Sequence, residues 1–222
     1  YDARDGSLLG CRHWARDVVR YAPDGVATVL ADTYRGGKFN SPNDCVLTPT
    51  GAIFFTDPAY GLGDRPSEQS VEAVYRLDPS GEVSRVIDDM TKPNGIYISP
   101  DGRWLYVADS IDQTIKAYRV GADGSCSDGR VLGELRAEEE GVPDGMTMDT
   151  HGRIYCTGSG GVWVFGPQGE LIGRILVPEP PANCTFGGRH LSTLYMTARS
   201  SVYAVETRAT GFMPPVTASG AE

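Results

Sequence analysis

The sequence predicts an all-β protein, and two observations support this prediction. Turn-forming residues are frequent, because 28 Gly and 15 Pro occur among 222 residues, in short clusters along the whole chain. In addition, a pattern of about fifty residues recurs, and it contains only short runs of strand-forming residues. No segment keeps an apolar stripe of helical period over three turns, so a repeat built from helices fits poorly.

The repeating unit begins with an Asn or Asp beside a Pro and reaches a turn glycine eight residues later. This spacing occurs in three copies: Asn43 to Gly51, Asn94 to Gly102, and Asp144 to Gly152. Successive copies start 51 and 50 residues apart. A fourth copy at 182–198 aligns through its Leu-Tyr-x-x-Ala segment, which places Asn183 at the position of Asn94. Residues 5–13 resemble the second half of one more copy.

Each complete copy predicts four short antiparallel strands in order along the chain. The first is a short alternating strand, expected at 46–47, 96–98 and 146–148. The second follows the turn glycine and is rich in β-formers, at 53–56, 104–108 and 154–157. The third leads into another turn, at 73–77, 114–120 and 161–165, and the fourth follows at 83–87, 131–135 and 171–177. Four strands in 45–50 residues are typical of a β-propeller blade, so the sequence predicts about four and a half to five such blades.

The repeat also predicts where polar groups gather. The innermost strand of every blade lines the central channel, so residues at equivalent positions converge on the axis. These positions hold Asn43, Asn94, Asp144 and, through the fourth copy, Asn183. One carboxylate and several amide oxygens suit a hard cation such as calcium, and the lack of His and Cys among them disfavours zinc or copper. Each residue taken singly is equally an ordinary turn residue that bonds its own backbone.

Composition excludes several classes of protein. The formal charge is −9 and no basic cluster is present, which argues against nucleic acid as a partner. No run of 18 apolar residues occurs, so a membrane-spanning helix is not predicted. The five cysteines are irregularly spaced and form no CxxC pair, so we expect free thiols and a cytoplasmic location. A GxSxG nucleophile elbow and a phosphate-binding glycine loop are both missing. His13 follows a predicted strand, where it could reach the channel mouth or serve only the local structure.

Six motifs in order resemble the SMP-30/gluconolactonase family. They are Asn40-Ser-Pro-Asn-Asp44, Phe54-Phe-Thr-Asp-Pro58 with Tyr60-Gly61, Lys92-Pro-Asn-Gly95, Pro100-Asp-Gly102, Val142-Pro-Asp-Gly-Met146 and Phe186-Gly-Gly188. The resemblance runs from about residue 6 to residue 205. It implies a six-bladed propeller, one axial divalent cation, and hydrolysis of a small-molecule sugar lactone. Calcium is the first expectation for this cation, with magnesium, manganese or zinc as alternatives.

The resemblance further implies roles for individual residues. Asn94 and Asp144 match direct metal ligands, and Asp144 also matches the general base. Asn43 matches a residue that contacts the metal or its water and also the substrate, so both Asn43 and Asn94 are expected to bind substrate. Asn183 matches a position lining the same pocket in some members.

One departure from the family pattern leaves other functions open. The family's remaining metal ligand is a first-blade glutamate in a Glu-Gly-Pro-type motif, and this chain has no such motif. We therefore expect a single propeller domain over 1–222 that is truncated at its N-terminus, with 207–222 as a disordered or loosely attached tail. A non-catalytic calcium-binding propeller and an interaction scaffold are the alternative functions, favoured if that glutamate is truly absent. Exposed blade edges would allow a homo-oligomer.

Overall fold

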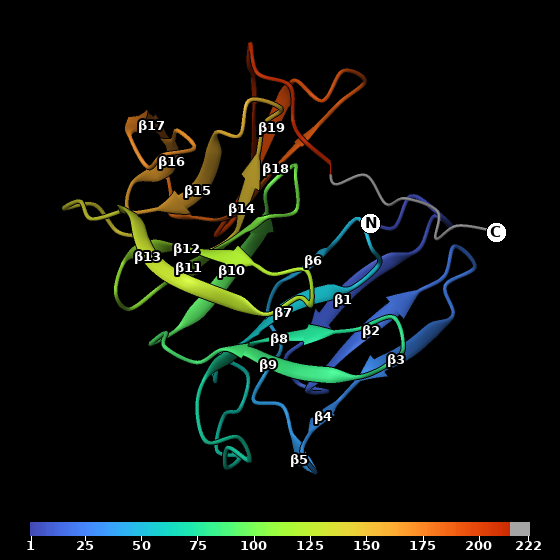
Figure 1. Ribbon diagram of the computed structural model, residues 1–222. Helices are drawn as coiled ribbons and strands as arrows, with labels where there is room; N and C mark the ends of the chain where they lie inside the picture. The colour runs from blue at the N-terminus through green and yellow to red at the C-terminus, as the bar shows by residue number, and fades with distance from the viewer. Residues whose placement is uncertain (214–222) are drawn as a thin grey trace. The chain divides into compact units, whose positions relative to one another are not determined.

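The computed structural model describes residues 1–213, and all regular structure within them is β (Figure 1). Twenty strands form antiparallel sheets that follow one another in chain order. The described residues form two compact units, 1–96 and 97–213. No helix among these residues has the length and apolarity needed to cross a membrane.

The first unit contains two sheets and a small hairpin. A three-stranded sheet consists of β1 (Leu8–Arg12), β2 (Asp17–Tyr21) and β3 (Ala27–Ala31). A four-stranded sheet consists of β6 (Cys45–Leu47), β7 (Ile53–Asp57), β8 (Ala73–Leu77) and β9 (Val83–Ile87). The hairpin of β4 (Thr33–Tyr34) and β5 (Gly37–Lys38) lies between them in sequence. The four-stranded sheet has the strand order that the repeat predicts.

The second unit contains the other three sheets, and β10 starts at the end of the first unit. The first sheet is β10 (Pro93–Ile98), β11 (Trp104–Asp109), β12 (Thr114–Val120) and β13 (Cys126–Glu134). The second is β14 (Met146–Met148), β15 (Ile154–Gly158), β16 (Gly161–Phe165) and β17 (Leu171–Leu176). The third is β18 (Pro181–Gly187), β19 (Thr193–Ala198) and β20 (Val202–Glu206). The described chain therefore holds five blade sheets, as the sequence predicts, three of them with four strands.

The turn glycines of the repeat all adopt the same backbone conformation, which explains why glycine occupies these positions. Gly51, Gly102 and Gly152 have φ angles of 87°, 69° and 76°, a left-handed conformation that favours glycine. In the third copy, the backbone N–H of Gly152 donates to the carbonyl of Asp149 at 2.9 Å, and Asp149 N–H donates to the Arg153 carbonyl at 3.0 Å. This tight turn fixes where the second strand of each sheet begins.

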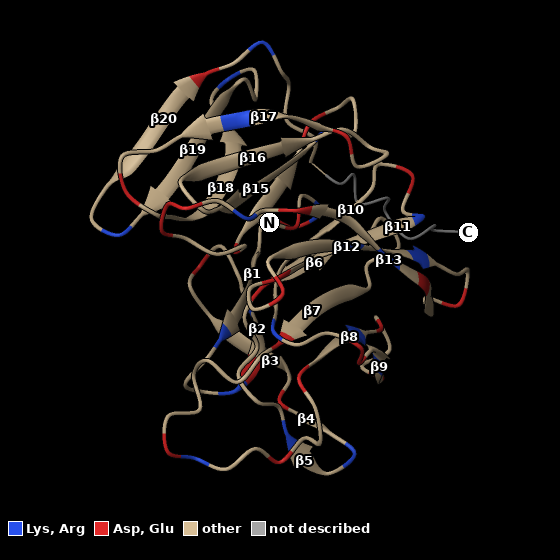
Figure 2. Cartoon of the chain, turned by 90° about the vertical axis from the view of Figure 1, so that its left-hand side faces the viewer, with Lys and Arg blue, Asp and Glu red and all other residues tan. Residues whose placement is uncertain are grey.

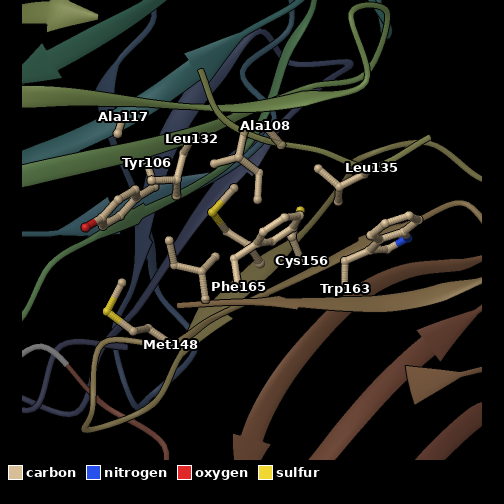
Figure 3. Packing of buried hydrophobic residues seen from close by; sticks show 12 residues of the cluster. Tyr106, Ala108, Ala117, Leu132, Leu135, Met148, Cys156, Trp163 and Phe165 are labelled. Atoms are coloured by element: carbon tan, nitrogen blue, oxygen red, sulfur yellow. The ribbon is translucent and has the colours of Figure 1, made fainter. Parts of the chain in front are cut away.

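Within each unit, apolar side chains pack between neighbouring sheets. In the second unit, one cluster joins side chains of β11–β13 to those of β14–β16, with Tyr106, Met148, Trp163 and Phe165 among its members (Figure 3). The rings of Trp163 and Phe165 stack with centroids 6.4 Å apart. Burial of such surface is the main stabilising term for each pair of neighbouring sheets. Lys and Arg are interspersed with Asp and Glu, mostly along loops and strand ends (Figure 2).

The expected loosely attached tail, 207–222, falls into two parts. In its first part, Thr207 N–H donates to the Ser192 carbonyl at 2.8 Å, Gly211 N–H to Leu191 at 2.7 Å, and Phe212 N–H to Met148 at 2.8 Å. Residues 207–213 are therefore attached to the second unit. Residues 214–222 lie outside the described part of the chain.

Candidate active site

Asn43 stands at the entrance to β6, and backbone pairing fixes it there. Its N–H donates to the carbonyl of Thr56 at 2.9 Å, and Thr56 N–H donates back to the carbonyl of Asp44 at 3.0 Å. Asp144 has the equivalent pairing in the second unit, where its N–H donates to the Thr157 carbonyl at 3.4 Å. The backbone thus confirms that these two repeat positions are equivalent.

Within the first unit, four polar side chains form a continuous chain of hydrogen bonds. Nδ2 of Asn43 donates to Oδ1 of Asn94, which is only 5% exposed. Nδ2 of Asn94 donates to the Tyr60 hydroxyl at 3.4 Å. At the other end, Nε2 of His13 lies 2.8 Å from Oδ1 of Asn43. An amide oxygen can only accept, so His13 carries its proton on Nε2 and donates it to Asn43.

The carboxylate of Asp44 links β6 to β10 next to these hydrogen-bonded side chains. Oδ1 of Asp44 accepts from Cys45 N–H at 2.8 Å, and its Oδ2 accepts from Ile96 N–H at 3.1 Å. Burial raises the pKa of Asp44 to about 6, although the two N–H donors oppose this rise. Asp44 therefore fixes the backbone on both sides of the contact between Asn43 and Asn94.

The loop after β7 packs tightly against the residues that precede Asn43. The Ser41 hydroxyl donates to the Pro58 carbonyl at 2.8 Å and accepts from Gly61 N–H at 2.7 Å. Gly61 sits so close to His13 that a Cβ at this position would lie 2.5 Å from the Cβ of His13. A glycine is therefore required beside His13, which explains the Tyr60-Gly61 pair of the sequence motif.

Asp57 anchors the same loop from inside the protein. Its side chain is fully buried, and Oδ2 accepts from Asn40 N–H at 2.8 Å. Its other oxygen, Oδ1, is buried without a hydrogen-bond partner. Burial raises the pKa of Asp57 to about 7, against the opposing effect of N–H donors.

Lys92 brings a positive charge close to Tyr60. Its Nζ lies 5.2 Å from the centre of the Tyr60 ring and 2.6 Å from Oε1 of Glu72. Oε2 of Glu72 accepts from Ala59 N–H at 3.0 Å, in the same loop as Tyr60. Both side chains of this ion pair are about one fifth exposed. The pair helps to hold Tyr60 beside Asn94.

Gly145 joins the segment of Asp144 to that of Asn183 within the second unit. Gly145, which follows Asp144, donates its N–H to the Ala182 carbonyl at 2.9 Å. A Cβ at Gly145 would lie 2.1 Å from Cγ of Asn183, so only glycine leaves room for that side chain. Asp144 is half-buried, whereas Asn183 is exposed, and its Oδ1 accepts from the N–H of Cys184 at 2.8 Å.

The four predicted site residues therefore divide between the two units: Asn43 contacts Asn94 in the first, and Asp144 and Asn183 both belong to the second. Convergence of both groups on one axis stays a prediction. Sequence reasoning left the role of His13 open and gave none to Tyr60. Neither residue has a counterpart in the other copies of the repeat, and the one signal for Tyr60 is its place in a family motif.

The donor chemistry of these residues fits a hard cation. Asn43, Asn94 and Asn183 carry amide oxygens, and Asp144 carries a carboxylate. Amide and carboxylate oxygens are typical calcium ligands. The described residues contain no cluster of three or more His, Cys, Asp or Glu placed to hold a metal. A cation at this site would therefore depend on amide oxygens.

Comparisons with known proteins show which family the sequence resembles. A family model described as the SMP-30/Gluconolactonase/LRE-like region matches residues 2–200. A gluconolactonase from Zymomonas mobilis is 34% identical over 221 residues, which cover 93% of this chain and 62% of that protein. Human regucalcin is 30% identical over 176 residues, 77% of this chain and 58% of that protein. The chain thus spans about three fifths of the length of these curated relatives.

A solved structure extends the similarity to the fold. A gluconolactonase from Xanthomonas campestris superimposes with a TM-score of 0.84 and 34% identity, covering 92% of this chain and 69% of that one. This agreement confirms that the five sheets are propeller blades, as the sequence predicts.

Proposed function

Because the chain belongs to the SMP-30/gluconolactonase/LRE-like family, we propose that it acts in the hydrolysis of sugar lactones with the help of a divalent cation. The observation that carries this proposal is the hydrogen bond between Asn43 and Asn94. Two amides 51 positions apart in the sequence meet at the ends of two inner strands, oriented by His13 and Tyr60. The similarity to a gluconolactonase supports the choice of substrate class.

The proposed cation ligands are Asn94 and Asp144, with Asn43 beside them. Calcium fits best because the donors are all oxygen atoms, with magnesium, manganese or zinc as alternatives. A bound divalent cation supplies Lewis-acid polarisation of the ester carbonyl. The protein's own part is to keep the amide oxygens of Asn43 and Asn94 in fixed orientations, which the bond from His13 does for Asn43.

Asp144 is the proposed general base. Its carboxylate would take a proton from the water that attacks the lactone carbonyl and return it to the ring oxygen as the carbon–oxygen bond breaks. Asn43, Asn94 and Asn183 would orient substrate hydroxyls through their amides. Water adds across the ester bond, so one lactone yields one hydroxy acid.

Proton release from glucono-lactone at constant pH tests this proposal, with spontaneous hydrolysis subtracted. We expect the full chain to accelerate hydrolysis with calcium and to lose this acceleration in a chelator. Asp144→Asn is expected to lower the rate by about 100-fold or more. Asp24→Asn is the matched control, because Asp24 is an exposed turn residue that accepts from Val26 N–H.

Two results would contradict the proposal. A rate that is the same with calcium and with chelator would remove the cation from the reaction. Calcium binding measured by calorimetry, without any acceleration of hydrolysis, would instead favour the non-catalytic calcium-binding alternative.

A further inference from the structure

β1 and β6 lie close to each other in the first unit. Alternate residues of a strand share a face, so residues 9 and 11 lie on one side of β1, and residues 45 and 47 lie on one side of β6. His13, which follows β1, contacts Asn43, which precedes β6, at 2.8 Å. Leu9 packs against the hydrophobic cluster that contains Leu47.

Each of these two strands contains a cysteine, Cys11 in β1 and Cys45 in β6. Both are free, half-buried cysteines, and both pack against that same cluster. Cα atoms of the two strands approach within 8 Å, and a disulfide joins residues whose Cα atoms are roughly 4.4–6.8 Å apart. A hydrogen bond with the Cys45 thiol, together with burial, raises the pKa of the Cys11 thiol. The two cysteines therefore lie close to each other, in one hydrophobic cluster between these strands.

The remaining cysteines have different surroundings. The thiol of Cys156 donates to the carbonyl of Thr157 at 3.3 Å, and that of Cys184 to the carbonyl of Tyr155 at 3.4 Å. Both are buried, whereas Cys126 begins β13 in the second unit. Cys11 and Cys45 differ from them in combining partial exposure with packing against the same hydrophobic cluster.

We propose that Cys11 and Cys45 are a modification site, a thiol pair that closes into a reversible disulfide bond between β1 and β6. The oxidant is a small-molecule disulfide. One cysteine attacks it, forming a mixed disulfide and releasing one small thiol. The second cysteine then attacks the mixed disulfide and releases the other small thiol. Two protein thiols are oxidised, one small disulfide is reduced, and the two thiol protons pass to the two released thiols.

This bond would lie directly beside the hydrogen-bonded pair His13 and Asn43. Each cysteine is two residues from one member of that pair along the sequence. Closing the bond draws the two strands together at this point. The inference does not depend on lactone hydrolysis, since its readout is the mass of linked peptides.

The test uses the full chain with oxidised glutathione, followed by acid quenching, alkylation of remaining thiols in denaturant, and peptide mapping by mass spectrometry. We expect the monomer to lose two hydrogen atoms, three of the five cysteines to be alkylated, and the Cys11 peptide to be linked to the Cys45 peptide. Dithiothreitol is expected to restore all five thiols.

Variants separate this pair from other cysteines. Cys45→Ser is expected to abolish the internal link and leave Cys11 as a thiol or a glutathione adduct, whereas Cys126→Ser keeps the link. The mapping of the unmutated chain needs no variant to fold. Five alkylated cysteines after oxidation, a link to a different cysteine, or a link only between two chains would each overturn the proposal.

Discussion

The imidazole of His13 donates from Nε2 to Oδ1 of Asn43 over 2.8 Å, and this bond determines which way the Asn43 amide points. With its oxygen engaged by His13, Asn43 must present its NH₂ group to Oδ1 of Asn94. If the amide of Asn43 turned over, its oxygen would face the oxygen of Asn94, and two acceptors repel each other. His13 is therefore a positioning residue for the amide pair.

Substitution of His13 is expected to act through this orientation. His13→Leu removes the donor and should lower the rate of lactone hydrolysis roughly fivefold, the value of a neutral hydrogen bond worth about 1 kcal/mol. His13→Gln retains an N–H donor at similar reach and should keep most of the rate. The side-chain amide resonances of Asn43 provide a readout independent of activity. Equal rates and unchanged resonances in the two variants would refute this role.

The sequence predicts much of the strand framework, because each sheet repeats the same turn and the same alternation. The strands expected at 73–77, 83–87 and 114–120 have those bounds in the structure. The strand expected at 131–135 instead begins at Cys126. Its first half contains Asp128 in a left-handed conformation (φ 53°) and Gly129, residues typical of a turn. Pairing with β12 through a shifted register outweighs that local preference.

The candidate site is predictable only where it follows the repeat. Asn43 and Asn94 occupy equivalent positions, and the structure does bring them into contact. His13 and Tyr60 reach the same place from a strand end and a loop, and a repeat carries no information about such unique segments. Their contribution depends on side chains distant in sequence, Asn43 for the first and Asn94 for the second.

Gly61→Ala is expected to destabilise the first unit. The added Cβ would overlap the side chain of His13, and overpacking of this kind costs about 1–3 kcal/mol. Urea denaturation followed by circular dichroism measures the change in the free energy of unfolding. Gly173→Ala is the control, since a Cβ there meets no atom within 4 Å and should change stability little. Equal stabilities of the two variants would show that the loop moves aside at no cost.

Asp57 is expected to make stability fall as pH rises. Its pKa is about 7 in the folded protein, against about 4 in an unfolded chain. Between these values the folded state holds more protons, so the free energy of unfolding decreases with increasing pH. Asp57→Asn removes the titrating group. The free energy of unfolding of the wild type, measured relative to that of this variant, should therefore decrease by about 2–4 kcal/mol from pH 4 to pH 8. Urea denaturation across this range measures it, and parallel pH profiles would contradict the expectation.

Substitution of Asp149 in the second unit measures how much one buried carboxylate of a repeat turn contributes to stability. It is fully buried and accepts from His151 N–H at 2.9 Å, Arg153 Nε at 2.5 Å and the Tyr155 hydroxyl at 3.1 Å. Asp149→Ala leaves these donors without their acceptor and is expected to lower the free energy of unfolding by about 2–4 kcal/mol. The loss should be smaller than for a fully buried ion pair, because Arg153 is one-third exposed. Asp149→Asn keeps an acceptor oxygen for the turn and should cost less. Thermal and urea denaturation would rank the two variants, with Asp24→Ala in an exposed turn as the control. If alanine and asparagine proved equally tolerated, the turn would be held by its backbone bonds and its glycine alone.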